Sequence, residues 1–172
     1  MNIKLVVSDI DGVWTDGGMY YDNRGNELKK FNTSDSAGIL FLREMGIKTA
    51  IITGEDTEIV RRRAEKLKVD FLYMGVRNKL KIARKICDDQ DISLDKHVAY
   101  IGDDIIDIPL LQKVALSAAP VDAPGYVKEH VIEIMTRKGG EGVFREFVEK
   151  LLESQGLLEK AIYKYLDKIK DF

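Results

Sequence analysis

Short apolar runs alternate with longer amphipathic segments along this chain, and that alternation restricts the fold more than any other feature of the sequence. The apolar runs have the length of buried strands and lie at residues 3–8, 47–52, 69–73, 98–101 and 114–118. The segments with helical spacing lie at residues 36–45, 56–67, 79–88, 106–113, 143–154 and 157–172. Strand–helix alternation favours parallel strands joined by right-handed crossovers. We therefore predict an α/β domain with a doubly wound, Rossmann-like parallel sheet.

Residues 17–31 interrupt this alternation and indicate an appended β-hairpin. Tyr20 and Tyr21 precede a run of turn-forming residues at 22–26, and a second strand candidate follows at 27–31. The chain has 172 residues, which suits one domain of ordinary size. We expect a single domain over residues 1–172 that ends in a helical tail at about 143–172.

Composition and charge argue against several classes of partner. The net charge is −2, which gives no electrostatic reason to expect nucleic-acid binding. No apolar run reaches the roughly 20 residues that cross a membrane, and residues 1–8 lack the pattern of a signal peptide. The single cysteine, Cys87, cannot form an internal disulfide, which suits a reducing compartment. We expect a cytoplasmic protein without nucleic-acid or membrane partners.

Residues with reactive side chains gather where the predicted strands end. This position matters because ligands of doubly wound sheets bind beyond the carboxyl ends of the strands. An acidic pair follows the first strand, a hydroxyl follows the second, a cation opens the helix after the third, and an acidic cluster follows the fourth. These residues are Asp9 and Asp11, Thr53, Lys79, and Asp103, Asp104 and Asp107.

Several carboxylates at one edge of a sheet repel one another unless a cation neutralises them. Oxygen ligands suit Mg²⁺, which also coordinates phosphate, and a carboxylate can attack phosphorus to form an aspartyl phosphate. In extended backbone, Asp9 and Asp11 point to the same side. We assign Asp9 as nucleophile and metal ligand, and Asp11 as general acid and then base, with its backbone carbonyl on the metal. Asp103 is the third protein ligand.

The remaining strand-end residues have supporting roles in this scheme. Thr53 and Lys79 hold the phosphoryl oxygens, Asp104 supports the waters of the metal, and Asp107 orients Lys79. Simpler interpretations exist for each residue type: an acidic pair can stabilise a turn, a threonine can be the N-cap of the next helix, and a lysine at a helix start is usually solvated.

In their order and spacing, these motifs resemble those of the haloacid dehalogenase superfamily of phosphatases. Residues 9–13 match its first motif, Thr53 the second, Lys79 the third and residues 102–107 the fourth. The resemblance implies a phosphoric monoester hydrolase with Mg²⁺ as cofactor. Many members carry a cap domain, but only a hairpin follows Asp11, and one helix and one strand separate Thr53 from Lys79. No cap fits this sequence.

The hairpin, the glycine-rich residues 139–146 and the chain length resemble a narrower capless group. This group comprises the 3-deoxy-D-manno-octulosonate 8-phosphate phosphatases and their relatives that act on nine-carbon 2-keto acids. The resemblance implies a homotetramer in which the hairpins associate, a neighbouring subunit covers each site, and the glycine-rich segment can fold over it. The partner would be a small sugar-acid phosphate of cell-surface polysaccharide synthesis.

Within the group, residues 53–55 and 61–66 look most like the 2-keto-3-deoxynononate 9-phosphate phosphatase branch. That resemblance implies substrate contacts by Gly54, Glu55, Arg63 and Lys66, with acylneuraminate 9-phosphate as a related substrate and the eight-carbon ester as an alternative. Glu55 and Lys66 are eleven positions apart, or ~16 Å along a helix. If both contact one sugar, we expect one of them to come from a neighbouring subunit.

Two other functions remain open on the sequence. A phosphatase with the same chemistry could act on a different sugar phosphate. A phospho-accepting signalling domain would also combine Asp, Thr, Lys and Mg²⁺ on a doubly wound sheet. Such domains, however, place the phosphorylated aspartate after a later strand than the acidic pair, whereas Asp9 and Asp11 both follow the first strand here.

Overall fold

The computed structural model describes residues 2–170 and contains a six-stranded parallel sheet. The spatial order of its strands is β5-β4-β1-β6-β7-β8. The strands are β1 (Leu5–Ser8), β4 (Lys48–Ile52), β5 (Phe71–Tyr73), β6 (Val98–Ile101), β7 (Leu116–Ala119) and β8 (Glu133–Ile134). The five predicted strands are present, and each pairs in parallel with its neighbours.

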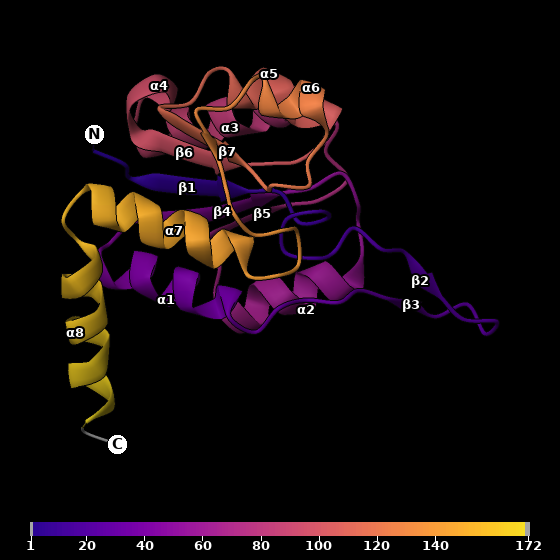
Figure 1. Ribbon diagram of the computed structural model, residues 1–172, viewed down its shortest axis with the longest axis horizontal. Helices are drawn as coiled ribbons and strands as arrows, with labels where there is room; N and C mark the ends of the chain where they lie inside the picture. Colours follow the sequence, from indigo (N-terminus) through magenta and orange to yellow (C-terminus); the bar gives the residue numbers. More distant parts are fainter. Residues whose placement is uncertain (1, 171–172) are drawn as a thin grey trace.

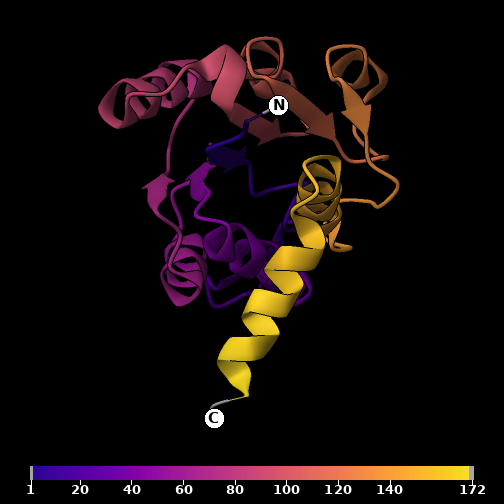
Figure 2. The ribbon, with the colours of Figure 1, turned by 90° about the vertical axis from the view of Figure 1, so that its left-hand side faces the viewer.

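Helices cover both faces of the sheet, as Figures 1 and 2 show. One face carries α1 (Asp35–Glu44), α2 (Glu58–Leu67) and α7 (Val143–Ser154), and the other carries α3 (Lys79–Gln90), α4 (Leu94–His97), α5 (Ile108–Leu111) and α6 (Gly125–Lys128). Alternate residues of β1 enter different cores: Val6 joins the α1 and α7 side, whereas Leu5 and Val7 join the α3 and α5 side. The predicted doubly wound α/β fold is therefore confirmed.

Several short elements differ from the prediction. The single helix expected at 106–113 is a 3₁₀ turn at Ile105–Asp107 followed by α5, which has a proline in its first turn. The sequence pattern missed α4, α6 and β8, which have only two to four residues each. A helical or alternating period cannot be recognised over so few positions.

The hairpin and the last helix extend from opposite ends of the molecule in Figure 1. The hairpin pairs β2 (Tyr20–Tyr21) with β3 (Glu27–Leu28) inside the predicted range. The last helix, α8 (Leu158–Ile169), packs against α1 and α7. It was expected to reach residue 172, and residues 171–172 lie outside the described part of the chain. Among residues 2–170, no helix has both the length and the apolar character needed to cross a bilayer.

The glycine-rich segment contacts the loop that follows β1. The Gly140 N–H donates to the Val13 carbonyl at 2.9 Å. A Cβ added at Gly139 would lie 2.1 Å from the Gly12 carbonyl oxygen, so a larger residue could not approach so closely. The segment therefore supports the loop after β1, and none of its residues lines the strand-end pocket described below.

Candidate active site

The candidate site lies where the strand order reverses. β1 is flanked by β4 and β6, so the chain leaves β1 toward one edge of the sheet and later returns to its other side. A crevice at such a point is the usual binding place of doubly wound folds. A cavity of about 270 Å³ opens there, and its lining residues are Asp9, Asp11, Gly12, Gly17, Thr53, Gly54, Glu55, Asp103, Asp104 and Ile106. We call it the strand-end pocket.

The backbone turns immediately after Asp9. The Ile10 carbonyl accepts the N–H groups of Val13, Trp14 and Thr15, which curls the chain into a helical turn. Trp14 is fully buried, and its ring N–H donates to Ser8 Oγ at 2.8 Å. The expected extended backbone across Asp9 and Asp11 is therefore wrong, because β1 ends at Ser8. Both side chains nevertheless line the same pocket.

Gly12 allows Asp103 to approach this turn. Gly12 has φ +80°, and a Cβ at this position would lie 1.9 Å from Asp103 Oδ2. Glycine is required on both counts, since other residues resist this backbone conformation and would displace the carboxylate. The turn after β1 and the loop after β6 thus meet at one point.

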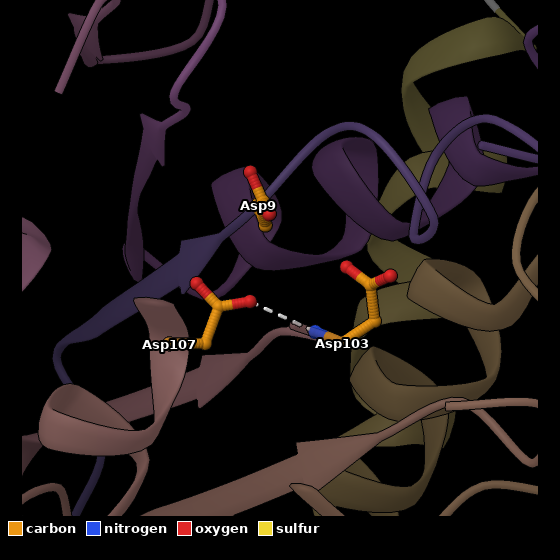
Figure 3. Close-up of side chains that lie close together, drawn as sticks. All are labelled: Asp9, Asp103 and Asp107. Atoms are coloured by element: carbon orange, nitrogen blue, oxygen red, sulfur yellow. Dashed lines mark hydrogen bonds between the residues drawn. The ribbon is translucent and has the colours of Figure 1, made fainter. Parts of the chain in front are cut away.

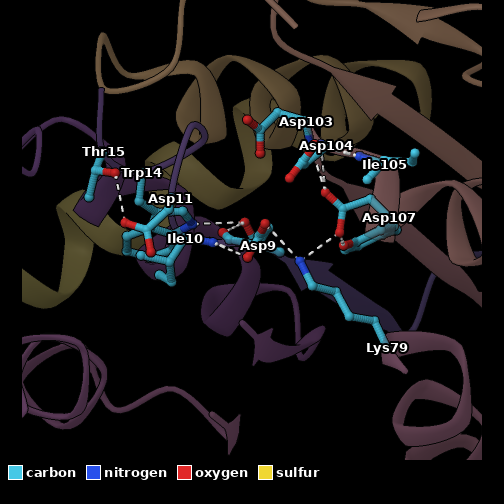
Figure 4. Close-up of polar contacts among 12 residues, drawn as sticks. Asp9, Ile10, Asp11, Trp14, Thr15, Lys79, Asp103, Asp104, Ile105 and Asp107 are labelled. Carbon is cyan, nitrogen blue, oxygen red and sulfur yellow. Dashed lines mark hydrogen bonds and ion pairs between the residues drawn. The ribbon is translucent and has the colours of Figure 1, made fainter. Parts of the chain in front are cut away.

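Lys79 is a buried cation beside Asp9, next to the strand-end pocket but outside its lining. It is the first residue of α3, its side chain is buried, and its ammonium lies 2.7 Å from Asp9 Oδ2 and 2.6 Å from Asp107 Oδ1 (Figure 4). Burial acts to lower the pKa of Lys79, but the charges of Asp9 and Asp107 outweigh it and raise the pKa. Lys79 is therefore a charged lysine with two carboxylate partners.

The carboxylate of Asp107 accepts four hydrogen bonds, two on each oxygen. Oδ1 accepts from Lys79 and from the Tyr100 hydroxyl at 2.5 Å. Oδ2 accepts the N–H groups of Asp103 and Asp104 at 2.9 and 3.0 Å, and Figure 3 shows the first of these contacts. Ligand atoms of Asp9, Asp103 and Asp107 lie within 4.8 Å of one another. Because its oxygens are already saturated by donors, Asp107 suits orientation of Lys79 better than metal ligation.

The positive charge near Asp9 and Asp103 does not offset the cost of ionising these two carboxyl groups. Burial raises the pKa of Asp9 to about 7, with Lys79 acting in the opposite direction. Burial, followed by the charges of Asp9 and Asp107, raises the pKa of Asp103 to about 8. Asp103 Oδ1 is buried without a hydrogen-bond partner among residues 2–170. These two carboxylates, of which Asp9 is buried and Asp103 partly buried, resist ionisation and suit a divalent cation with oxygen ligands.

Asp11 is held by a residue that the sequence pattern did not single out. Its Oδ1 accepts from the Thr15 hydroxyl at 3.2 Å and from the ammonium of Lys29 at 2.7 Å. Lys29 follows β3 of the hairpin and reaches back to the pocket. No motif marked it, because Lys29 follows a strand of the hairpin and not a strand of the main sheet.

Thr53 and Asp104 occupy different positions in the pocket. Thr53 is buried directly after β4, and it does not cap α2, whose N-cap residue is Thr57. The alternative interpretation of Thr53 as an N-cap is thus wrong. Asp104 caps the 3₁₀ turn, since its carboxylate accepts the N–H of Ile105 at 2.7 Å. A role on metal-bound waters stays a prediction for Asp104.

The four predicted substrate residues are divided between two cavities. Gly54 and Glu55 line the strand-end pocket. Arg63 and Lys66 line a second cavity of about 580 Å³, together with Phe31, Ile59, Arg62 and Glu65. We call it the α2 pocket. One protomer therefore does not bring Glu55 and Lys66 to a common pocket, in agreement with the spacing argument.

Arg63 is tied to the segment that leaves the hairpin. Its guanidinium donates to the Asn32 carbonyl at 3.2 Å and to Ser36 Oγ at 3.1 Å, and it lies 5.6 Å from the centre of the Phe31 ring. Its Nε is buried without a partner in the described part of the chain. Arg63 is therefore fixed in place with one donor unused.

Comparison with known proteins identifies the family. No family model matches the chain. The 3-deoxy-D-manno-octulosonate 8-phosphate phosphatase KdsC of Escherichia coli (strain K12) is 39% identical over 160 residues, which cover 93% of this chain and 85% of the relative. The chain belongs to this family of phosphatases.

Two solved structures of the family are similar along nearly the whole chain. A KdsC-type phosphatase from Moraxella catarrhalis, in complex with magnesium ion, phosphate ion and KDO, has TM-score 0.90 at 32% identity and covers 95% of this chain and 93% of its own. A structure named as a haloacid dehalogenase superfamily (subfamily III A) hydrolase, from Legionella pneumophila, has TM-score 0.92 at 38% identity and covers 96% and 90%.

The family confirms the enzyme class and the capless fold. This chain is a phosphoric monoester hydrolase of the haloacid dehalogenase type, and only α2 and β5 lie between Thr53 and Lys79. The expected metal cofactor is confirmed by the magnesium of the Moraxella relative together with the acidic cluster of this chain. The finer resemblance to the nine-carbon branch is not shown, because the curated relatives are named for the eight-carbon substrate.

Proposed function

We propose that this phosphatase hydrolyses the phosphate ester of a 2-keto-3-deoxy sugar acid through an aspartyl phosphate on Asp9, with Mg²⁺ as cofactor. One observation carries the proposal. Lys79 is buried between Asp9 and Asp107, next to an Asp103 with a free oxygen, in a chain 39% identical to a phosphatase of that substrate class.

In the first step, a carboxylate oxygen of Asp9 attacks phosphorus, and the bond from phosphorus to the sugar oxygen breaks. Oδ1 of Asp9 accepts the Ile10 N–H at 2.7 Å and Oδ2 lies beside Lys79, so the nucleophile is oriented before substrate arrives. Lys79 and the Thr53 hydroxyl stabilise charge on the phosphoryl oxygens. Asp11 donates a proton to the departing sugar oxygen.

In the second step, Asp11 accepts a proton from water, and that water attacks the phosphorus of the aspartyl phosphate. The bond between phosphorus and Asp9 breaks, which releases phosphate, restores the carboxylate of Asp9 and leaves Asp11 protonated for the next turnover. Asp9 and Asp103, with the backbone carbonyl of Asp11, would hold Mg²⁺ through oxygen ligands. The ion supplies positive charge that offsets the carboxylates and the phosphate group.

Two substrates of one class are candidates. The relatives favour 3-deoxy-D-manno-octulosonate 8-phosphate. The nine-carbon 2-keto-3-deoxynononate and acylneuraminate 9-phosphates are the second candidate, because residues 53–55 and 61–66 resemble that branch and Glu55, which lines the strand-end pocket, can accept hydrogen bonds from a sugar. The phosphate of either ester would occupy the site beside Asp9.

Substrate recognition would require more than one subunit. The hairpin exposes apolar side chains that include Tyr20, Tyr21 and Leu28, and such a surface suits association of hairpins in a homotetramer. Arg63 and Lys66 of one subunit would then reach the substrate carboxylate and sugar of a neighbour.

Cys87 is buried and unpaired, which suits the predicted cytoplasmic location.

A panel of phosphorylated sugars tests the substrate. We expect kcat/KM for the eight- and nine-carbon keto-acid phosphates to exceed that for hexose 6-phosphates by about 100-fold or more, because several charged and polar contacts distinguish them. A Glu55→Gln variant should lose more activity on the nine-carbon ester than on the eight-carbon ester if Glu55 recognises the longer sugar. Equal kcat/KM across the panel would overturn the proposed substrate class.

Release of phosphate over many turnovers separates this function from a signalling domain. The wild-type chain should release many equivalents of phosphate per subunit with Mg²⁺. A domain that only accepts a phosphoryl group would stop after one equivalent and accumulate phosphoprotein.

A further inference from the structure

The hairpin places one buried cation beside Asp11, which lines the strand-end pocket. Lys29 follows β3, its side chain is fully buried, and its ammonium lies 2.7 Å from Asp11 Oδ1 and 3.7 Å from Glu27 Oε1. Its neighbour Lys30 is exposed and lies 3.9 Å from Asp16. Adjacent lysines thus point to different environments, and only Lys29 reaches the site.

The backbone on both sides of Lys29 is fixed. On one side, Leu28 pairs with Tyr20 in the hairpin. On the other side, Phe31 forms a bridge with Thr15 of the loop after β1. Thr15 is also the residue whose hydroxyl donates to Asp11. The backbone bridge between Thr15 and Phe31 therefore holds the two donors to Asp11, Thr15 and Lys29, in a fixed relative position.

The two carboxylate oxygens of Asp11 have different surroundings. Oδ1 accepts from both Lys29 and Thr15. Oδ2 is buried and has no hydrogen-bond partner among the described residues. Asp11 lines the pocket with Asp9 and Asp103. A carboxylate fixed through one oxygen presents the other in a single orientation, as proton transfer to a leaving group requires.

We propose that Lys29 is a positioning residue, which holds Asp11 through Oδ1 and leaves Oδ2 as the oxygen that exchanges the proton with the sugar oxygen. The proposal rests on the proposed role of Asp11 as general acid. The ammonium of Lys29 is paired with Asp11 Oδ1 at 2.7 Å, so it acts through Asp11 and not on the substrate. The hairpin then supports the chemistry of its own subunit, besides offering a surface to neighbours.

Leaving groups of different basicity test this role. A sugar alkoxide must be protonated as it departs, whereas 4-nitrophenolate leaves as a stable anion and gains little from a general acid. We expect Lys29→Met to lower kcat/KM for 3-deoxy-D-manno-octulosonate 8-phosphate by about 100-fold, the usual contribution of a general acid, and for 4-nitrophenyl phosphate by no more than about threefold.

Two further variants sharpen the test. Lys29→Arg keeps a positive donor and should recover most of the activity on the sugar phosphate. Lys30→Met removes the adjacent lysine and should leave kcat/KM unchanged on both substrates. Lys29→Gln, which keeps a polar group beside Asp11, repeats the comparison if Lys29→Met does not fold, as judged by circular dichroism.

Equal losses on both substrates would overturn the proposal, because they would show general damage to the site. Unchanged activity on the sugar phosphate would overturn it as well. If the wild-type enzyme prefers a different alkyl phosphate, the proposed substrate class fails, and the same comparison with that alkyl phosphate still decides the role of Lys29.

Discussion

The strand-end pocket and the α2 pocket differ in how their charges are held. Asp9 of the first pocket and the adjacent Lys79 and Asp107 come from three separate segments and are buried, and Lys79 pairs with both carboxylates. In the second, Arg62, Glu65 and Lys66 are exposed on one helix beside Phe31. The difference teaches that a single chain assembles the charges of the proposed catalytic site, whereas the second pocket holds, among the described residues, one fixed guanidinium, Arg63.

The largest effect should come from removing Asp9, the proposed nucleophile of the strand-end pocket. Asp9→Asn keeps the size of the side chain but lacks a carboxylate that can attack phosphorus, so kcat should fall by about 10³-fold or more. Steady-state phosphate release measures this loss. Asp89→Asn, at an exposed position of α3, is the matched control and should retain full activity. Substantial turnover by Asp9→Asn would refute covalent catalysis at this residue.

Loss of the buried cation Lys79 should be nearly as severe and should also affect stability. Lys79→Met leaves Asp9 and Asp107 buried without their shared partner, which costs about 3–5 kcal/mol of unfolding free energy for a broken buried pair. We expect kcat to fall by about 100-fold or more.

Urea unfolding and phosphatase assays measure the two effects of Lys79→Met. Lys81→Met removes an exposed lysine from the same helix and serves as the control. If Lys79→Met and the wild-type protein unfold at the same urea concentration, the ion pairs of Lys79 with Asp9 and Asp107 do not stabilise the fold.

A smaller effect should follow from changes in the α2 pocket. Arg63→Met should raise KM for a keto-acid sugar phosphate by about 10- to 100-fold, as expected for a lost hydrogen bond to a charged group. The same variant should change KM for a phosphate ester without a carboxylate by much less. Arg62→Met, in the same pocket but exposed, is the control. If KM changes equally for both substrates, Arg63 does not recognise the substrate carboxylate.

The pH dependence of magnesium binding tests the carboxylates of the strand-end pocket without any substitution. Asp9 and Asp103 have pKa values raised to about 7 and about 8, so below those values the metal must displace protons. Magnesium affinity should rise with pH from 6 to 8, by up to about tenfold per pH unit for each proton released. Calorimetric titration with Mg²⁺ measures it, and an affinity independent of pH would contradict the raised pKa values.

The same two carboxyls should affect the stability of the metal-free protein in the opposite direction. Their folded-state pKa values lie above the ordinary value of 3.8, so the folded state binds more protons than the unfolded state between about pH 4 and 8. The free energy of unfolding should therefore decrease as pH rises through that window. Added Mg²⁺ should reduce the decrease, and urea unfolding at several pH values measures both.

Much of the fold could be predicted from the sequence because long periodic segments report burial directly. Strands such as β1 are apolar on both faces, and the residues after them had to meet at one edge of the sheet. Asp9, Thr53, Lys79 and Asp103 were found in this way. The short elements α4, α6 and β8 were missed, since two to four residues do not define a period.

The sequence by itself determined the order of strands and helices and the residues that gather at the strand ends. Only the tertiary structure decided that Lys29 holds Asp11 from the hairpin, that Asp107 is saturated by donors, and that Arg63 and Glu55 lie in different pockets. The physical reason is the distance along the sequence between the residues that interact. Periodicity depends on neighbours within a few positions, whereas these contacts depend on side chains that meet only after distant segments pack.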